Sequence, residues 1–125
     1  MRALIERSLA PDAAYTVVSV ISDRADAGGL EVARQLGVVA RALPRPAGSE
    51  RADYDRLLAA AISEYSPALI VLAGFMRILS GEFVERFAGR ILNIHPSLLH
   101  RAAAPASTRP GRAPCAAVRP PRPGR

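Results

Sequence analysis

Residues 68–73 read ALIVLA, an apolar run that lies between Pro67 and Gly74. A short, continuous apolar run between turn-forming residues is typical of a β-strand that is buried on both faces of a sheet. Residues 15–21, YTVVSVI, have the same character and are rich in β-branched side chains. Two such strands predict a parallel sheet whose two faces are covered by helices.

Segments with helical spacing of apolar residues alternate with these runs. We expect helices over 2–9, 26–36, 50–65 and 80–88, and two further strands over 38–43 and 90–94. Asp26 and Ser80 are the predicted N-caps, and Gly37 follows the second helix. This alternation predicts an α/β fold, a Rossmann-like parallel sheet with crossover helices. A right-handed layout also needs a strand before the first helix, so we expect the sheet to be incomplete.

The basic charge of the chain is confined to its last 26 residues. The 125 residues include 17 Arg and 11 acidic residues, and the formal net charge is +6. Residues 1–99 hold 11 Arg and all 11 acidic residues, whereas residues 100–125 hold six Arg and no acidic residue. The second segment is rich in Pro, Arg and Ala and lacks periodicity. We therefore expect a folded part over 1–99 and a disordered tail over 100–125.

Composition excludes several classes of protein. The single cysteine, Cys115, permits no intramolecular disulfide, and no apolar run approaches the ~18–20 residues that span a bilayer. The N-terminus has no signal-peptide pattern, so we expect a cytoplasmic protein without a membrane partner. Six aromatic residues and no Trp argue against base stacking on nucleic acid. The sequence contains no cluster of His and Cys residues that would indicate a metal site.

Two predicted strands end in residues that can carry chemistry. The first end is AGFMRIL, residues 73–79, and the second is NIHPS, residues 93–97. Asn93 and His95 project to the same side of an extended segment, which places an amide donor beside an imidazole. The amide can stabilise an oxyanion, and the imidazole can exchange a proton near neutral pH. Because ligands bind outside the carboxyl ends of parallel strands, these two ends predict a site.

Each of these residues also has a structural interpretation. A histidine at a strand end is more often a hydrogen-bonded structural residue, and an asparagine there is more often a turn former. Met76 taken alone is more consistent with packing than with ligand contact. Residues 51–54, RADY, open a helix, where charged residues commonly form a solvated face.

The combination of motifs is more specific than any single residue. VLAGFMRILS (71–80), ILNIHPSLL (91–99) and ISDRADAGGLEVARQLGV (21–38) together resemble the glycinamide ribonucleotide formyltransferases of purine biosynthesis. The resemblance covers about residues 2–99 and marks them as a partial formyltransferase N-terminal domain. Asn-x-His-Pro-Ser is shared with other folate formyltransferases, including the methionyl-tRNA type, which stays open as an alternative. GFMRIL favours the glycinamide ribonucleotide enzymes.

The resemblance implies a reaction and a role for each matching residue. These enzymes transfer a formyl group from the co-substrate 10-formyltetrahydrofolate to the amine of glycinamide ribonucleotide. His95 would be the catalytic acid/base, and Asn93 would hold the formyl oxygen and contact the folate. The remaining folate-binding residues would be Arg51, on the facing helix, and Met76, Arg77, Ile78 and Leu79. No metal is implied.

The chain also departs from the family pattern. The family has a phosphate-binding loop before the first helix and, later in the chain, an aspartate that pairs with the histidine; neither is in this sequence. We therefore expect a chain truncated at both ends, with a shifted reading frame after Leu99. Two other hypotheses stay open: an inactive remnant, and a protein that binds nucleic acid through its basic tail in a salt-sensitive way.

Overall fold

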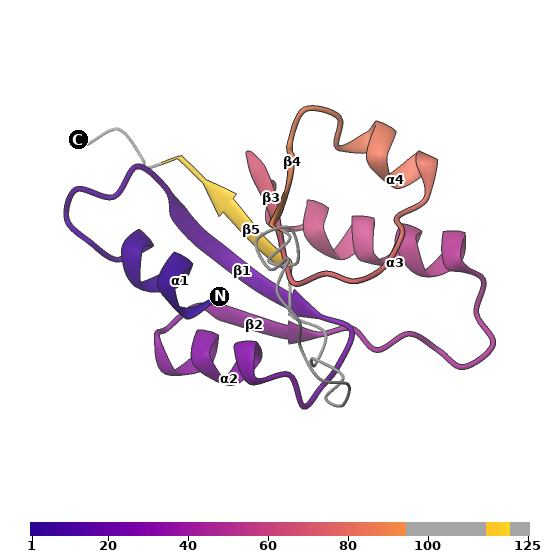
Figure 1. The fold of residues 1–125 in the computed structure, drawn as a ribbon, viewed down its shortest axis with the longest axis horizontal. Coiled ribbons are helices and arrows are strands. Elements are labelled where there is room, and N and C mark those ends of the chain that lie inside the picture. Colours follow the sequence, from indigo (N-terminus) through magenta and orange to yellow (C-terminus); the bar gives the residue numbers. More distant parts are fainter. Residues whose placement is uncertain (95–114, 121–125) are drawn as a thin grey trace, which may run out of the picture.

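The computed structural model describes residues 1–94 and 115–120, in which five strands form one sheet with helices on both faces (Figure 1). The helices are α1 (Arg2–Ser8), α2 (Gly28–Gln35), α3 (Arg51–Ser63) and α4 (Gly81–Arg86). The strands are β1 (Thr16–Ser22), β2 (Val39–Ala42), β3 (Leu69–Ala73), β4 (Ile91–Ile94) and β5 (Cys115–Arg119). Each helix and strand predicted within residues 2–94 is present, so the α/β prediction is confirmed.

The sheet has the order β2-β1-β5-β3-β4. β1 pairs in parallel with β2, and β3 pairs in parallel with β4. Helices α1 and α2 pack on one face, where Ile5, Leu30 and Val20 are buried, and α3 and α4 pack on the other, where Tyr54 and Phe83 are buried. The hydrophobic core therefore lies in two layers, one on each side of the sheet.

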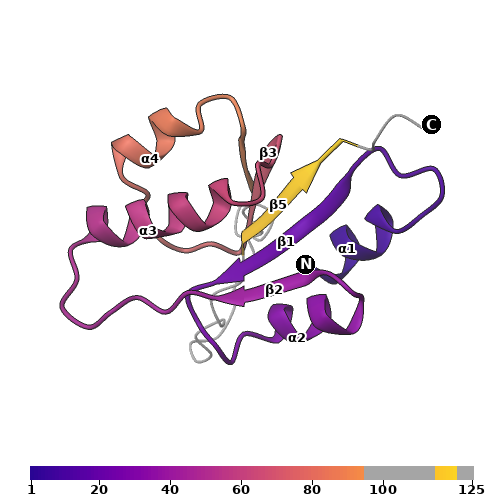
Figure 2. The same cartoon turned by 180° about the vertical axis from the view of Figure 1, so that it is seen from behind.

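The central strand β5 corrects the sequence-based expectation of a wholly disordered tail. Cys115–Arg119 lies between β1 and β3 and runs antiparallel to both (Figure 2). The position between β1 and β3 is buried on both faces of the sheet. The small apolar side chains from Cys115 to Val118 fit this position, with exposed fractions of 5% or less. The sheet is therefore mixed rather than purely parallel.

The C-terminal end of β5 is held by a basic side chain. Arg119, one of the six tail arginines, donates from its guanidinium to the backbone carbonyl oxygens of Tyr65 and Ser66, which follow α3. This arginine therefore fixes β5 to the fold. The other tail arginines, and the predicted boundary at residue 99, lie outside the described residues.

The predicted helix ends are right at two positions and wrong at one. The Oγ of Ser80 accepts the N–H of Phe83 and caps α4, and Gly37 follows α2 with a positive φ of 74°. Asp26 is not the N-cap of α2, which is Ala27. The carboxylate of Asp26 instead accepts two hydrogen bonds from the guanidinium of Arg24. The carboxylate of Asp26 therefore pairs with an exposed arginine rather than with a backbone N–H of α2.

The two faces of the sheet are covered to different extents. On the α1/α2 face, an apolar groove of about 440 Å³ lies over β3 and β4. Leu92 and Ile94 border it and are 50% and 43% exposed. Within residues 1–94 and 115–120, no helix has the length and apolar character needed to cross a membrane.

Candidate functional site

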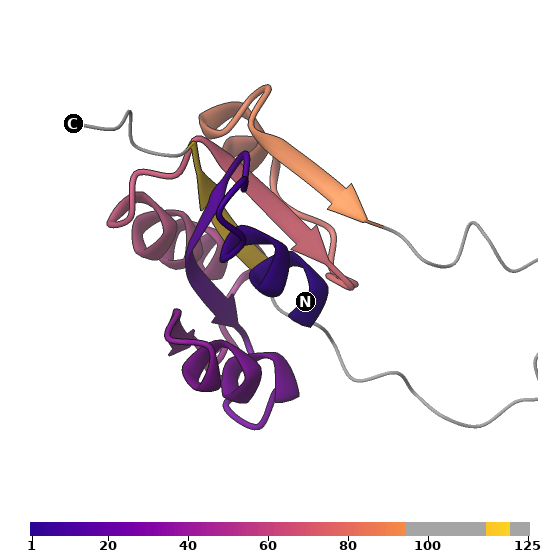
Figure 3. The same cartoon turned by 90° about the vertical axis from the view of Figure 1, so that its left-hand side faces the viewer.

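The two predicted strand ends lie at the same edge of the sheet. Strands β3 and β4 lie side by side and point the same way (Figure 3). In their ladder, Leu72 pairs with Asn93 and Ala73 pairs with Ile94. The loop after β3 and the end of β4 are therefore neighbours, as the sequence predicts. Asn93 is exposed and shares with Leu72 the α3/α4 side of the sheet. His95 lies outside the described residues.

Alternate residues of the loop after β3 turn in opposite directions. Gly74 starts the loop with a φ of +67°, a conformation that favours glycine. Phe75 and Leu79 pack against the α3/α4 core. Met76 and Ile78 point outward and are 57% and 76% exposed. The loop thus presents two large apolar side chains to solvent at the carboxyl edge of the sheet.

These two side chains border a depression that we call the carboxyl-edge hollow. It has an empty volume of about 590 Å³, open to solvent, and is lined by Arg45, Arg51, Met76, Arg77 and Ile78. Arg51 is the first residue of α3, and Arg45 lies in the loop after β2. A hollow with apolar side chains and exposed guanidinium groups suits a ligand that has an apolar body and an anionic end.

The hollow brings together four of the residues predicted for folate binding. Arg51, Met76, Arg77 and Ile78 line it, whereas Leu79 packs in the core and Asn93 lies on the neighbouring strand. Arg45 was not predicted. The only sequence signal for it is its place in the loop 44–49, where its guanidinium hydrogen-bonds the hydroxyl and carbonyl oxygens of Ser49.

The side chain of Arg77 turns inward and is only 8% exposed. Its guanidinium lies 3.8 Å from an oxygen of Asp23 and 4.0 Å from an oxygen of Asp55. The Cζ atom of the guanidinium lies over the Tyr54 ring, 4.3 Å from its centre, a cation–π contact. Sequence reasoning missed this cluster and treated the start of α3 as a solvated face, but Tyr54 and Asp55 are each 1% exposed.

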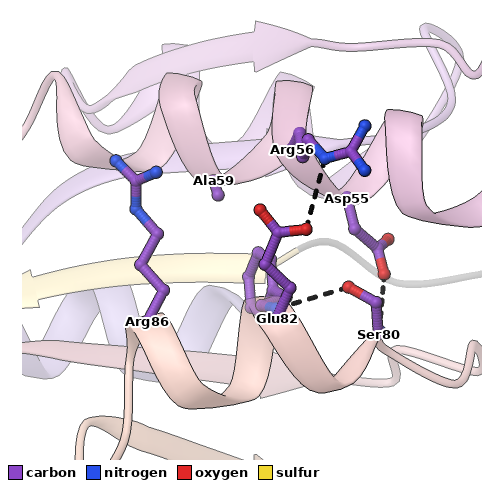
Figure 4. A pocket seen from close by; sticks show the side chains of 7 residues that line it. Asp55, Arg56, Ala59, Ser80, Glu82 and Arg86 are labelled. Atoms are coloured by element: carbon purple, nitrogen blue, oxygen red, sulfur yellow. Dashed lines mark hydrogen bonds and ion pairs between the residues drawn. The ribbon is translucent and has the colours of Figure 1, made fainter.

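The carboxylate of Asp55 also holds the end of the loop. Its second oxygen accepts the backbone N–H of Ser80 at 2.6 Å (Figure 4). Helices α3 and α4 are also joined at their exposed surface, where the guanidinium of Arg56 donates a hydrogen bond to a carboxylate oxygen of Glu82. The loop after β3 is thus tied to α3 at Arg77 and at Ser80.

The Tyr54 hydroxyl connects the same cluster to the loop after β2. It donates to the carbonyl oxygen of Leu43 at 2.7 Å. Burial, reinforced by the negative charge of Asp23, raises the pKa of Tyr54 to about 12, so the hydroxyl keeps its proton at neutral pH. The loops that follow β1, β2 and β3 are therefore joined through one buried polar cluster: Asp23, Tyr54, Asp55 and Arg77.

Two further observations concern possible metal ligands and the single cysteine. Within the described residues, no group of three or more His, Cys, Asp or Glu side chains is placed to hold a metal ion. Cys115 is 3% exposed in the central strand, and its burial raises the thiol pKa to about 12. The thiol therefore stays protonated and enclosed, which makes it a packing residue in this fold.

The sequence of the chain matches a known protein family. The sequence model of the formyl transferase family matches residues 1–108. Phosphoribosylglycinamide formyltransferase of Escherichia coli (strain K12) is 56% identical over 84 residues, which are 67% of this chain and 40% of that protein. The trifunctional purine biosynthetic protein adenosine-3 of Gallus gallus is 41% identical over 99 residues, 79% of this chain and 10% of that protein.

A solved structure extends the similarity to three dimensions. The phosphoribosylglycinamide formyltransferase of Brucella melitensis superposes with a TM-score of 0.71 at 41% sequence identity. The superposition covers 77% of this chain and 50% of that one. The chain therefore spans half or less of the length of these relatives.

Proposed function

This chain belongs to the formyl transferase family, and from that premise we propose that it acts as a phosphoribosylglycinamide formyltransferase. It would transfer a formyl group from 10-formyltetrahydrofolate to the primary amine of glycinamide ribonucleotide in purine biosynthesis. The observation that carries the proposal is the carboxyl-edge hollow, where Met76, Ile78 and Arg51 lie together. The strand that leads into its loop, β3, pairs with β4, which bears Asn93. Similarity to phosphoribosylglycinamide formyltransferases supports the choice of acceptor.

The residues at the hollow fit a formylated folate. A folate has a flat ring system, which Met76 and Ile78 can cover with apolar surface, and a carboxylate end, which an arginine can bind. Arg51 is an exposed arginine that lines the hollow, so it suits the carboxylate end. The apolar pair would exclude water from the ring and orient it toward β4. The folate itself supplies the formyl group.

Asn93 and His95 would serve the transfer step. The amine nitrogen of the ribonucleotide forms a bond to the formyl carbon, and the bond from that carbon to the folate nitrogen breaks. The side-chain amide of Asn93 would donate to the formyl oxygen while negative charge develops on it. His95 would take the proton that the amine loses and return a proton to the leaving nitrogen.

A transfer assay tests the proposal. The purified chain is mixed with 10-formyltetrahydrofolate and glycinamide ribonucleotide, and both formylated ribonucleotide and free formate are measured. We expect formyl transfer to the ribonucleotide, and we expect His95→Ala to slow it by a factor of ~10² or more, the scale of general acid–base catalysis. Equal rates for the two proteins, or formate release without transfer, would overturn the proposed function.

A further inference from the structure

We propose that Arg77 is a positioning residue, one whose buried guanidinium fixes the loop after β3 so that Met76 and Ile78 face a bound folate. The inference rests on the proposed function. It gives Arg77 a role different from that of the exposed Arg51: the side chain of Arg77 acts through its neighbours in the loop, while Arg51 faces the ligand.

Successive side chains of the loop after β3 differ sharply in their exposure to solvent. The side chain of Arg77 is 8% exposed, whereas Met76 before it and Ile78 after it are 57% and 76% exposed. Large apolar side chains are more stable out of water, so an unrestrained loop would tend to turn them inward. The chain bends at Arg77, whose buried side chain lies between these two exposed ones. An inward Arg77 therefore turns Met76 and Ile78 outward together.

The second step is the charged surroundings of the guanidinium. Asp23 follows β1 and Asp55 lies on α3, so two separate elements of the fold place a carboxylate within 4.0 Å of it, although its two terminal nitrogens are buried and make no hydrogen bond. Both carboxylates are largely buried, with side-chain exposures of 14% and 2%. The guanidinium also lies over the Tyr54 ring in a cation–π contact. A planar, forked cation can face two carboxylates and an aromatic ring at once, which the single ammonium of lysine cannot reproduce.

Ile78 lies between two fixed points of the loop. Arg77 is held on one side, and on the other the N–H of Ser80 is held by the same Asp55 carboxylate. Only Leu79 separates Ile78 from Ser80, and Leu79 is packed in the core. The backbone at Ile78 therefore has little freedom to rotate, so its side chain stays in the hollow.

Binding of a folate analogue measures the effect of this anchor. The probe is a non-reactive deazafolate analogue of 10-formyltetrahydrofolate, titrated calorimetrically into the purified chain. We expect Arg77→Lys, which keeps the positive charge, to bind the analogue at least tenfold more weakly. The matched control is Arg56→Lys, an exposed arginine that also pairs with two carboxylates, those of Asp53 and Glu82. Its affinity is expected to stay within twofold of the wild type.

A double-mutant cycle distinguishes positioning from a general structural role. If Arg77 acts by orienting Ile78, then Arg77→Lys has little left to disturb once Ile78→Ala has removed that side chain. We expect Arg77→Lys to weaken binding less than threefold in the Ile78→Ala background. Full multiplication of the two single effects would overturn the inference.

Two further outcomes separate this inference from the proposed function. A wild-type chain that does not bind the analogue would overturn the proposed function and, with it, the role of Arg77. A wild-type chain that binds, together with an Arg77→Lys variant that binds equally well, would overturn the role of Arg77 alone. If Arg77→Lys shows no cooperative thermal unfolding, Asp23→Asn replaces it in the cycle and carries the same expectation, because it removes one anchor and keeps the arginine.

Discussion

The loop after β3 and the end of β4 lie at the same edge of the sheet, but the protein holds them in different ways. The loop is tied to α3 through Arg77 and Ser80, which both meet the buried carboxylate of Asp55. In β4, the residues from Leu92 to Ile94 are exposed, and the strand lies at the end of the sheet order. The loop proposed to bind folate is therefore held against the core, with Met76 and Ile78 exposed on its outer side. Asn93, proposed to act in transfer, lies on an edge strand.

The largest effect should come from removing the buried carboxylate. Asp55→Ala leaves Arg77 with one fewer anchor and the N–H of Ser80 without its acceptor. We expect the free energy of unfolding in urea to fall by about 3–5 kcal/mol. The matched control, Asp53→Ala, removes an exposed carboxylate two residues away that pairs with Arg56. It should change stability by less than about 1 kcal/mol. Similar losses for both variants would mean that Asp55 does not anchor the loop.

A core residue directly across the ladder from Asn93 should give the next largest effect. Leu72 pairs with Asn93 and is 4% exposed. Leu72→Ala removes packing against the α3/α4 core and should cost about 2–5 kcal/mol, measured by urea unfolding. A loss below about 1 kcal/mol would show that this end of β3 is as loosely held as β4.

The cysteine of the central strand β5 should give a smaller effect, a dependence of the free energy of unfolding on pH. Burial raises the pKa of the Cys115 thiol to about 12, whereas an unfolded thiol ionises near pH ~8.5–9. Between pH ~8.5 and about 12 the thiol loses its proton in the unfolded chain but keeps it in the folded protein. The contribution of the buried thiol to stability is therefore complete below pH ~8.5 and declines above it. Raising the pH from 8 to 10 should lower the free energy of unfolding by about 1–2 kcal/mol.

The variant Cys115→Ala isolates this contribution. Urea unfolding at pH 8 and at pH 10 gives the change in stability for both proteins, and the variant should show the smaller change. Tyr54, whose pKa is also raised to about 12, begins to contribute only near pH ~10 and is the same in both proteins. Identical pH dependence in the two proteins would contradict a buried position for β5.

The smallest effect on stability is expected at the edge strand. Asn93 is exposed, so Asn93→Ala should change the free energy of unfolding by less than about 0.5 kcal/mol. Formyl transfer, if Asn93 stabilises the charge on the formyl oxygen, should fall ~10²–10³-fold. Transfer assays and urea unfolding on the same preparation give both values. A stability loss that matches the loss of activity would assign Asn93 a structural role instead.

Most of the fold could be predicted from the sequence because its signals are local. Residues 68–73 are all apolar and residues 15–21 are mostly apolar and β-branched. The helices between the strands have regular apolar spacing, so the positions of these elements follow from the sequence pattern. The strand Cys115–Arg119 could not be predicted in the same way. It is short, and its partners β1 and β3 lie far away along the chain. Its place depends on the position between those two strands rather than on its own pattern.

The candidate site was predictable where the motif is local and not where it depends on burial. The run from Met76 to Leu79 and the residue Asn93 follow directly from strand ends and from the family resemblance. The inward turn of Arg77 and its contacts with Asp23 and Asp55 depend on side chains from three separate segments. Charged residues at a helix start are normally exposed, so nothing in residues 51–55 signals that Asp55 is buried.

Hydrogen exchange with and without the deazafolate analogue tests the central claim, that the carboxyl-edge hollow binds the folate, most directly. Backbone amides of residues 75–79 should exchange more slowly when the analogue is present, whereas those of α2, on the opposite face of the sheet, should not change. This result would place the ligand against Met76 and Ile78. Unchanged exchange over residues 75–79 at a saturating concentration of the analogue, or protection confined to other segments, would contradict the claim.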